Sequence, residues 1–258
     1  MAPDMFRKGL SLGLLIIIMI LPRPGQTQDA GETVRSAWDH FRGQASRSKV
    51  IMTIHRPSWE RTMTMKGWTK GEAMSLIRIL APPKDKGNGT LKKGSEMWTY
   101  NPKINRVIKL PPSMMAQSWM GSDFSNNDLV KSDSILTDYS HEIEGQTTHQ
   151  DKTVFIIRSV PKPLAPVVWG MQVLHIREDH IVLSQEFFDE DLQPVKIMTT
   201  SDLEVIDGRL FPTKWVMRKS DFQDEYTELV HEQIEFLDDL PDRLFTLGVL
   251  RNPSGDPR

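Results

Sequence analysis

The chain has 258 residues, a formal net charge of −2 and no cysteine. A chain this close to neutral lacks the basic surface that nucleic-acid binding requires, so we expect no nucleic-acid partner. The absence of cysteine excludes disulfides, thiolate metal sites, thiol nucleophiles and a lipidated N-terminal cysteine.

The N-terminal segment has the pattern of a secretory signal. Arg7 and Lys8 precede an apolar run from Gly9 to Leu21. A short basic region before about 7–15 apolar residues is typical of a signal peptide, whereas a relaxed membrane span needs roughly 20 residues. We expect residues 1–30 to be a signal peptide cleaved between about residues 27 and 30, leaving residues 31–258 as one exported domain without a transmembrane span. The alternative is an uncleaved anchor.

A short amphipathic helix is the first element predicted in the remaining chain, over Glu32–Gly43. Val34, Ala37, Trp38 and Phe41 recur at helical spacing, and the final glycine is a typical helix stop. Such a helix needs a sheet or a cavity to cover with its apolar face.

From Lys49 onward the hydrophobic period changes to two, which indicates strands. In the first half, alternation runs through Val50–Ile54, Met63–Met65 and Met74–Leu76, and we expect a polar connection over Pro82–Gly94. In the second half the predicted strands are Val154–Val160, Gln172–Ile176, Ile181–Phe188, Val195–Ile206, Phe211–Lys219 and Glu225–Phe236. Short turns between neighbours, such as Asp207-Gly208, favour antiparallel pairing.

Between these halves, the sequence predicts a hairpin followed by a lid. Glu96–Leu110 contains two short strand patterns around a turn that includes Pro102. The segment Pro111–Phe124, called the lid segment below, is rich in methionine and tryptophan. After it, Ser125 and Asp128 have the spacing of a capping box with aspartate in place of glutamate, which predicts a short helical turn.

These elements predict a mainly β protein: one large curved antiparallel sheet of about ten or eleven strands, forming an incomplete (half) β-barrel capped by short helices. A large sheet covered by so few apolar elements is expected to enclose a ligand cavity. The candidate cavity and lid residues are apolar or aromatic: Trp38, Met52, Met63, Met65, Trp98, Tyr100, Met114, Met115, Trp119, Met120, Phe124 and Trp215. Methionine adapts to variable apolar partners, although it also fills irregular cores. Trp98 and Tyr100 could equally be cross-strand aromatics.

Catalytic patterns are missing. The seven histidines form no H-x-x-x-H or H-E-x-x-H pair, and the sequence contains no G-x-S-x-G, P-loop or G-x-G-x-x-G. We therefore expect no enzyme, no metal site and no cofactor. Asp123 and Asp128 could be paired carboxylates of a hydrolase, but roles in a turn and a cap suit their positions better. Arg106 and Lys109 could bind an anionic headgroup, or form an ordinary solvated strand face.

The chain resembles the LolA-like outer-membrane lipoprotein-sorting proteins. The motifs that carry the resemblance are Trp98-Thr99-Tyr100-Asn101-Pro102, Arg106-Val107, Ser118-Trp119-Met120-Gly121-Ser122-Asp123-Phe124 and Asp128-Leu129, with Trp68, Lys70-Gly71, Ala81-Pro82-Pro83, Lys86-Gly87, Phe245-Thr246 and Leu250 around them. The resemblance covers nearly all of residues 31–258. It implies a half-barrel of the LolA/LolB/LppX kind in the periplasm.

The resemblance also implies a function. An apolar cavity would bind acyl chains of a lipoprotein or lipid for transport or sorting to the outer membrane. The alternative is an accessory protein of an RND- or ABC-type export system, with an inner-membrane transporter complex as its partner.

Overall fold

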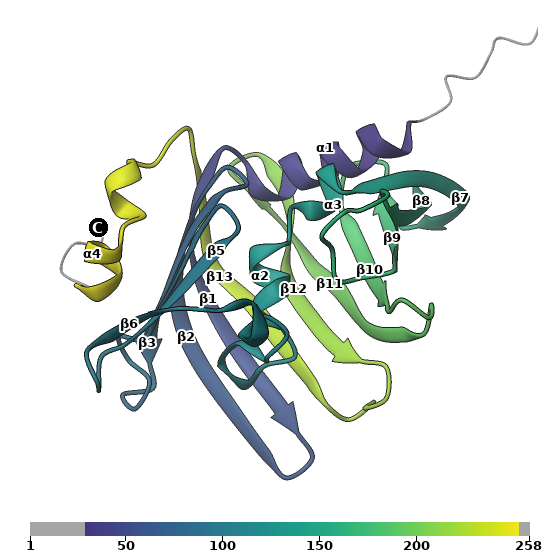
Figure 1. Cartoon of the computed structure of the whole chain (residues 1–258). Helices are drawn as coiled ribbons and strands as arrows, with labels where there is room; N and C mark the ends of the chain where they lie inside the picture. Colours follow the sequence, from purple (N-terminus) through teal and green to yellow (C-terminus); the bar gives the residue numbers. More distant parts are fainter. Residues whose placement is uncertain (1–28, 253–258) are drawn as a thin grey trace, which may run out of the picture.

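The computed structural model of the protein describes residues 29–252 (Figure 1). The predicted signal peptide lies outside this range except for Asp29 and Ala30, its last two residues, which belong to the start of the first helix. None of the helices formed by the described residues has the length and apolar character required to span a bilayer.

Most of the described chain forms strands. These are β1 (Ala45–Arg56), β2 (Trp59–Lys70), β3 (Met74–Ala81), β4 (Gly89–Lys93), β5 (Glu96–Asn101), β6 (Arg106–Lys109), β7 (Tyr139–His149), β8 (Lys152–Pro161), β9 (Met171–Arg177), β10 (Val182–Phe188), β11 (Pro194–Ile206), β12 (Arg209–Lys219) and β13 (Tyr226–Leu237). The helices are α1 (Ala30–Arg42), α2 (Asn126–Val130), α3 (Ser134–Thr137) and α4 (Leu247–Arg251), with short 3₁₀ helices η1 (Pro112–Met114), η2 (Trp119–Gly121) and η3 (Asp242–Leu244).

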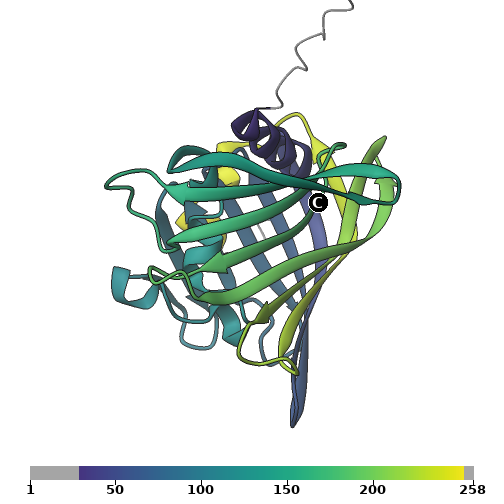
Figure 2. The ribbon, with the colours of Figure 1, turned by 90° about the vertical axis from the view of Figure 1, so that its right-hand side faces the viewer.

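All thirteen strands belong to one sheet, in the order β6-β5-β4-β3-β2-β1-β13-β12-β11-β10-β9-β8-β7. Every pairing is antiparallel, and β1 joins the two halves by pairing with β13. A sheet of this width twists and curls, and Figure 2 shows its second half curving around the concave side. The predicted fold class, a mainly β half-barrel with few helices, is therefore confirmed.

The prediction of ten or eleven strands was too low, because β4 and β7 were missed. β4 lies inside the predicted polar connection Pro82–Gly94, but it pairs with β3 and β5 and buries Leu91. β7 is an edge strand that is largely exposed along one face and interrupted by a bulge between Ile143 and Gly145. Both strands are rich in polar residues, so hydrophobic alternation does not reveal them.

Helix α1 closes one open end of the half-barrel (Figure 1). The Asp29 carboxylate accepts the N–H groups of Gly31 at 2.7 Å and Glu32 at 3.2 Å, so the helix begins two residues earlier than predicted. Gly43 ends it with a φ of 63°, a conformation that suits glycine. The buried face, which includes Val34 and Trp38, packs against a cluster from β7, β8, β9 and α3.

The lid segment, with α2 and α3 after it, crosses the concave side of the sheet (Figure 1). Ser125 and Asp128 form the predicted capping box at the start of α2. On the convex side, the C-terminal segment with η3 and α4 covers β4–β6. There, the buried Arg78 guanidinium donates to the carbonyls of Val249 and Leu250, both at 2.7 Å, which fixes α4 to the sheet.

Candidate ligand-binding cavity

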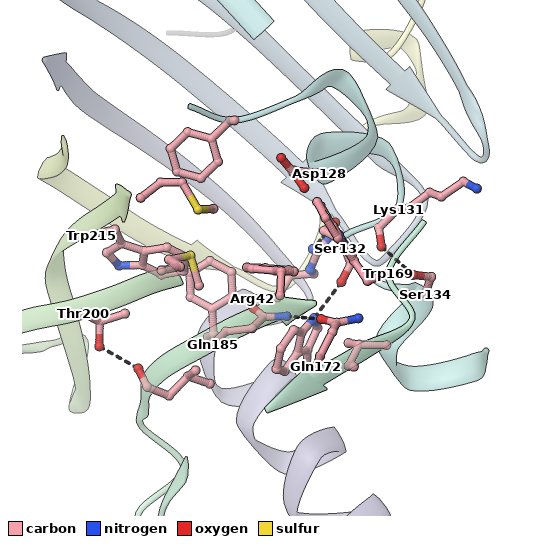
Figure 3. A pocket seen from close by; sticks show the side chains of 18 of the residues that line it. Arg42, Asp128, Lys131, Ser132, Ser134, Trp169, Gln172, Gln185, Thr200 and Trp215 are labelled. Carbon is pink, nitrogen blue, oxygen red and sulfur yellow. Dashed lines mark hydrogen bonds between the residues drawn. The ribbon is translucent and has the colours of Figure 1, made fainter. Parts of the chain in front are cut away.

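A cavity of about 170 Å³ lies on the concave side of the sheet (Figure 3). Its walls come from α1, from the segment between Phe124 and Tyr139, and from β9–β12. The aromatic side chains that line it are Trp38, Phe41, Phe124, Tyr139, Trp169, Phe187 and Trp215. The aliphatic ones are Ile135, Val168, Ile181, Val182, Met198, Pro212 and Met217. The cavity is therefore dominated by apolar side chains.

Aromatic rings support two sides of the cavity. On one side, the ring of Phe41 packs against Trp215 with centroids 4.4 Å apart and against Phe211 at 5.8 Å. On the other side, Trp169 and Phe187 pack at 5.3 Å. Aromatic pairs at such distances add stability beyond the area that they bury, so these walls are well defined.

Most polar side chains of the lining bond to one another or to the backbone, as Figure 3 shows. Gln185 Nε2 donates to Gln172 Oε1 at 2.6 Å, and Thr200 Oγ1 donates to the Val182 carbonyl at 2.6 Å. Ser134 Oγ donates to the Lys131 carbonyl at 2.8 Å. Because buried polar groups that are paired in this way lose little on desolvation, the lining behaves as an apolar surface over most of its area.

Asp128, a residue of the wall, forms a buried ion pair with Lys196 of β11, which lies outside the lining. Lys196 Nζ donates to Asp128 Oδ2, and the two side chains are only 5% and 8% exposed. The ammonium also lies over the rings of Trp169 at 4.9 Å and Phe187 at 5.3 Å. Burial lowers the pKa of Lys196, and the Asp128 carboxylate opposes this shift. The pair therefore joins α2 to β11 with no net charge.

A second buried cluster holds α1 and α3 together. Asp133, the residue before α3, forms an ion pair with Arg42 at 2.6 Å and accepts a hydrogen bond from Lys92 on β4 at 2.7 Å. Burial lowers the pKa of Lys92, and Asp133 raises it. Removing one member of such a cluster leaves an uncompensated buried charge, so the three residues fix the end of α1 beside the cavity.

The chain matches one family model, and its structure is similar to several solved structures. A family model whose description reads "-like: Uncharacterized protein" matches residues 71–252, more than half of the chain. The structure is similar to a DUF1329 family protein from Desulfovibrio piger, with a TM-score of 0.77 and 23% identity over 86% of this chain and 97% of that one.

The structure is also similar to a LolA superfamily protein from Nitrosomonas europaea, with a TM-score of 0.72 and 19% identity over 85% of this chain and 98% of that one. An outer membrane lipoprotein-sorting protein domain from Vibrio parahaemolyticus has a TM-score of 0.72 and 18% identity, over 86% and 98% of the two chains. The chain belongs to the family that this model describes, and it has a LolA-like fold.

These three structures share the fold with this chain, and at such low identity they carry no ligand over to it. None of the curated proteins matches the chain significantly. The assignment of a binding site in this protein therefore depends on the residues of its own cavity.

Three of the predicted ligand-binding residues line the cavity: Trp38 from α1, Phe124 from the end of the lid segment, and Trp215 from β12. The other nine lie elsewhere. Seven of them, all except Trp98 and Tyr100, form one packed core beneath the lid segment: Met52, Met63, Met65, Met114, Met115, Trp119 and Met120.

The core beneath the lid segment is closely packed. Met52 and Met63 have no exposed surface, and Trp119 is 5% exposed and donates its indole N–H to Thr90 Oγ1 at 3.1 Å. The lid segment thus rests directly on β1–β3 and β5, and the space for a guest lies beyond it, toward β9–β12. Contact between these residues and a ligand stays a prediction.

Trp98 and Tyr100 lie in a different cluster, together with Leu250 of α4. Their alternation along β5 puts them on the opposite side from Met97, which faces the lid segment. Arg106 and Lys109 on β6 are also outside the cavity lining, and Lys109 pairs with Glu96.

Both carboxylate oxygens of Asp123, considered above as a hydrolase residue, are hydrogen-bonded. Its buried carboxylate accepts from Arg56 at 2.9 and 3.1 Å and from the Thr227 hydroxyl at 2.7 Å. These contacts anchor the end of the lid segment to β1 and β13. Within residues 29–252, no group of three or more histidine, aspartate or glutamate side chains could hold a metal ion.

The sequence analysis did not predict the polar residues of the lining or the ion pair beside it. Gln172 and Gln185 stand at positions where alternation points inward, and a glutamine in an inward position was a usable signal. Asp128 and Lys196 are 68 residues apart, and nothing in the sequence pairs them. Trp169 lies in the loop between β8 and β9, a segment without periodicity.

Proposed function

We propose that the protein is a non-enzymatic periplasmic carrier that binds acyl chains of a lipoprotein or lipid in the cavity described above. The observation that supports this is a mainly apolar cavity between the sheet and its helical covers in a half-barrel of LolA-like fold. Each buried CH₂ group contributes about 0.8 kcal/mol, so a chain of several carbons gains substantial affinity.

The size of the cavity sets a condition on this function. Its volume of about 170 Å³ is close to the roughly 150 Å³ of an engineered cavity that holds benzene, so the closed form accommodates only part of an acyl chain. Longer chains require movement of the covering elements. The loop between β8 and β9 is the best placed, because it carries Trp169 and is joined to the cover by a hydrogen bond from Lys131 to the Pro166 carbonyl.

Native mass spectrometry with lipid extraction, after export to a bacterial periplasm, tests the proposal. We expect co-purified lipid in the wild type and much less in Met198→Trp, which fills the cavity. Leu192→Trp, in the exposed turn between β10 and β11, is the matched control and should keep its lipid. Protein that stays empty and has no affinity for lipids or acylated peptides would contradict a carrier role.

A second candidate, an accessory protein of an RND- or ABC-type export system, is favoured by the cavity volume alone. About 170 Å³ is less than the roughly 300–1,000 Å³ of common ligand pockets. In that case, co-purification with an inner-membrane complex should be the same for wild type and Met198→Trp. Loss of the complex in this variant would instead show that the partner binds only when the cavity can hold a ligand.

A further inference from the structure

Two buried polar atoms of the cavity lining have no hydrogen-bond partner among the described residues: Asp128 Oδ1 and Arg42 Nε. The Asp128 side chain is more than nine-tenths buried and forms part of the cavity wall (Figure 3). An unsatisfied buried polar atom costs stability, and such atoms are rare in native proteins. One of the two accepts hydrogen bonds and the other donates them.

The second oxygen of Asp128 takes all of the interactions that this carboxylate makes. Asp128 Oδ2 accepts from the Ser125 backbone N–H at 2.6 Å, from the Ser125 hydroxyl at 2.8 Å and from Lys196 Nζ. The capping box and the ion pair therefore hold the carboxylate rigidly. Its other oxygen is left as a preoriented acceptor within apolar surroundings.

We propose that the cavity takes an uncharged amphiphile whose hydroxyl or amide N–H donates to Asp128 Oδ1, with its hydrocarbon chain against the aromatic and methionine side chains. This inference rests on the proposed function and names the chemical class of the ligand.

Charged headgroups fit this site poorly. An anion would face the Asp128 carboxylate. The charge of Arg42 is already neutralised by Asp133, and Lys131 donates to the Pro166 carbonyl. A cation would meet a carboxylate, that of Asp128, which Lys196 already neutralises from outside the lining, so it would carry an uncompensated charge into an apolar site. A neutral donor avoids both costs.

Probes that share a ten-carbon chain test this inference on the wild-type protein, with undecane as the probe that has no polar atom. 1-Decanol and 1-methoxydecane differ in the donor, because the ether keeps an acceptor oxygen and loses the O–H. A hydrogen bond to a charged group is worth at least a tenfold change in affinity, so calorimetric titration should give 1-decanol and decanamide Kd values lower by about tenfold or more than that of the ether. Decanoate at pH 8 should bind more weakly than 1-decanol.

Variants locate the effect. In Asp128→Ala combined with Lys196→Met, which leaves no unpaired lysine, the preference for alcohol over ether should fall below about twofold. Thr200→Val is the control, because this lining hydroxyl already donates to the Val182 carbonyl, and the preference should persist.

Equal affinities for the alcohol and the ether in the wild type would overturn the inference, and so would a preference that survives in the double variant. The wild-type comparison holds even where the double variant does not fold. If no probe binds, undecane included, the proposed carrier function fails as well. If all uncharged probes bind equally, only the assignment of Asp128 fails.

Discussion

The anchor of the lid segment should be a large contributor to stability. Asp123 carries a side chain with no exposed surface and accepts two hydrogen bonds from Arg56 and one from the Thr227 hydroxyl. Asp123→Asn keeps the shape of the side chain but removes its charge and sets an amide N–H against the Arg56 guanidinium. The variant therefore leaves a buried cation without its main partner.

The expected cost follows from the burial of this pair. Removing one partner of a buried ion pair costs about 3–5 kcal/mol. Arg56 keeps a second contact, to Glu225 at 3.2 Å, so the lower end of that range, about 3 kcal/mol, is expected. For a domain of this size, about 3 kcal/mol corresponds to a decrease in Tm of roughly 6–12 °C.

Urea and thermal unfolding of both variants measure the effect. Glu225→Gln is the matched control, because Glu225 contacts the same guanidinium but is 28% exposed, and it should cost no more than about 1 kcal/mol. A double-mutant cycle with Arg56→Met isolates the coupling. An unfolding free energy of Asp123→Asn within about 1 kcal/mol of the wild type would refute the anchoring argument.

Three further predictions concern other parts of the fold. Burial lowers the pKa of His231, which packs against Phe211 and Trp215, from 6.5 to about 4, so the unfolded chain binds more protons between these values. The contribution of neutral His231 to the free energy of unfolding, about 3 kcal/mol, is then fully present above pH 6.5 and lost as the pH falls through 4. In His231→Phe, the free energy of unfolding measured in urea should therefore depend less on pH across this window. Gly170→Ala should cost at least about 1–3 kcal/mol, since its Cβ would lie 2.3 Å from the Asp189 carbonyl oxygen, whereas Gly145→Ala meets no atom closer than 3.9 Å and should stay within about 1 kcal/mol. In a chain that keeps Asp29, Asp29→Ala removes the cap of α1 and should cost about 1 kcal/mol in thermal unfolding, against no measurable change for the exposed Asp39→Ala on the same helix. Equal unfolding free energies for Asp29→Ala and Asp39→Ala would contradict the capping role of Asp29. A Gly170→Ala variant as stable as the wild type would contradict the steric argument at Gly170, and an unchanged pH dependence of stability in His231→Phe would contradict the argument from the buried imidazole.

Two elements cover the concave side, the lid segment and the loop between β8 and β9, and they differ in how they are held. The lid segment is joined to β1 and β13 by a buried ion pair and rests on a methionine core, so it behaves as part of the sheet's interior. The loop between β8 and β9 contributes Trp169 to the cavity and bonds to the other cover through Lys131. A guest larger than the cavity is therefore expected to displace this loop before the lid segment.

Local sequence patterns were enough to predict much of the fold. Alternating residues such as Val50, Met52 and Ile54 must point to one face of a strand, and that face had to be buried. The helix at the start, the capping box of Ser125 and the short antiparallel turns depend on contacts within a few residues, so they could be read directly. β4 and β7 were missed because their pairing partners, and not their own residues, define them.

The position of the cavity could not be obtained in this way. The sequence by itself determined that a methionine- and tryptophan-rich segment would cover the concave side, because so much apolar surface must leave water. Only the tertiary structure decided that this segment fills its half of the half-barrel, and that the space for a ligand lies beside it. The contacts that decide this, such as Asp128 with Lys196 and Arg42 with Asp133, join residues 68 and 91 positions apart, and a charge in a sequence does not reveal its distant partner.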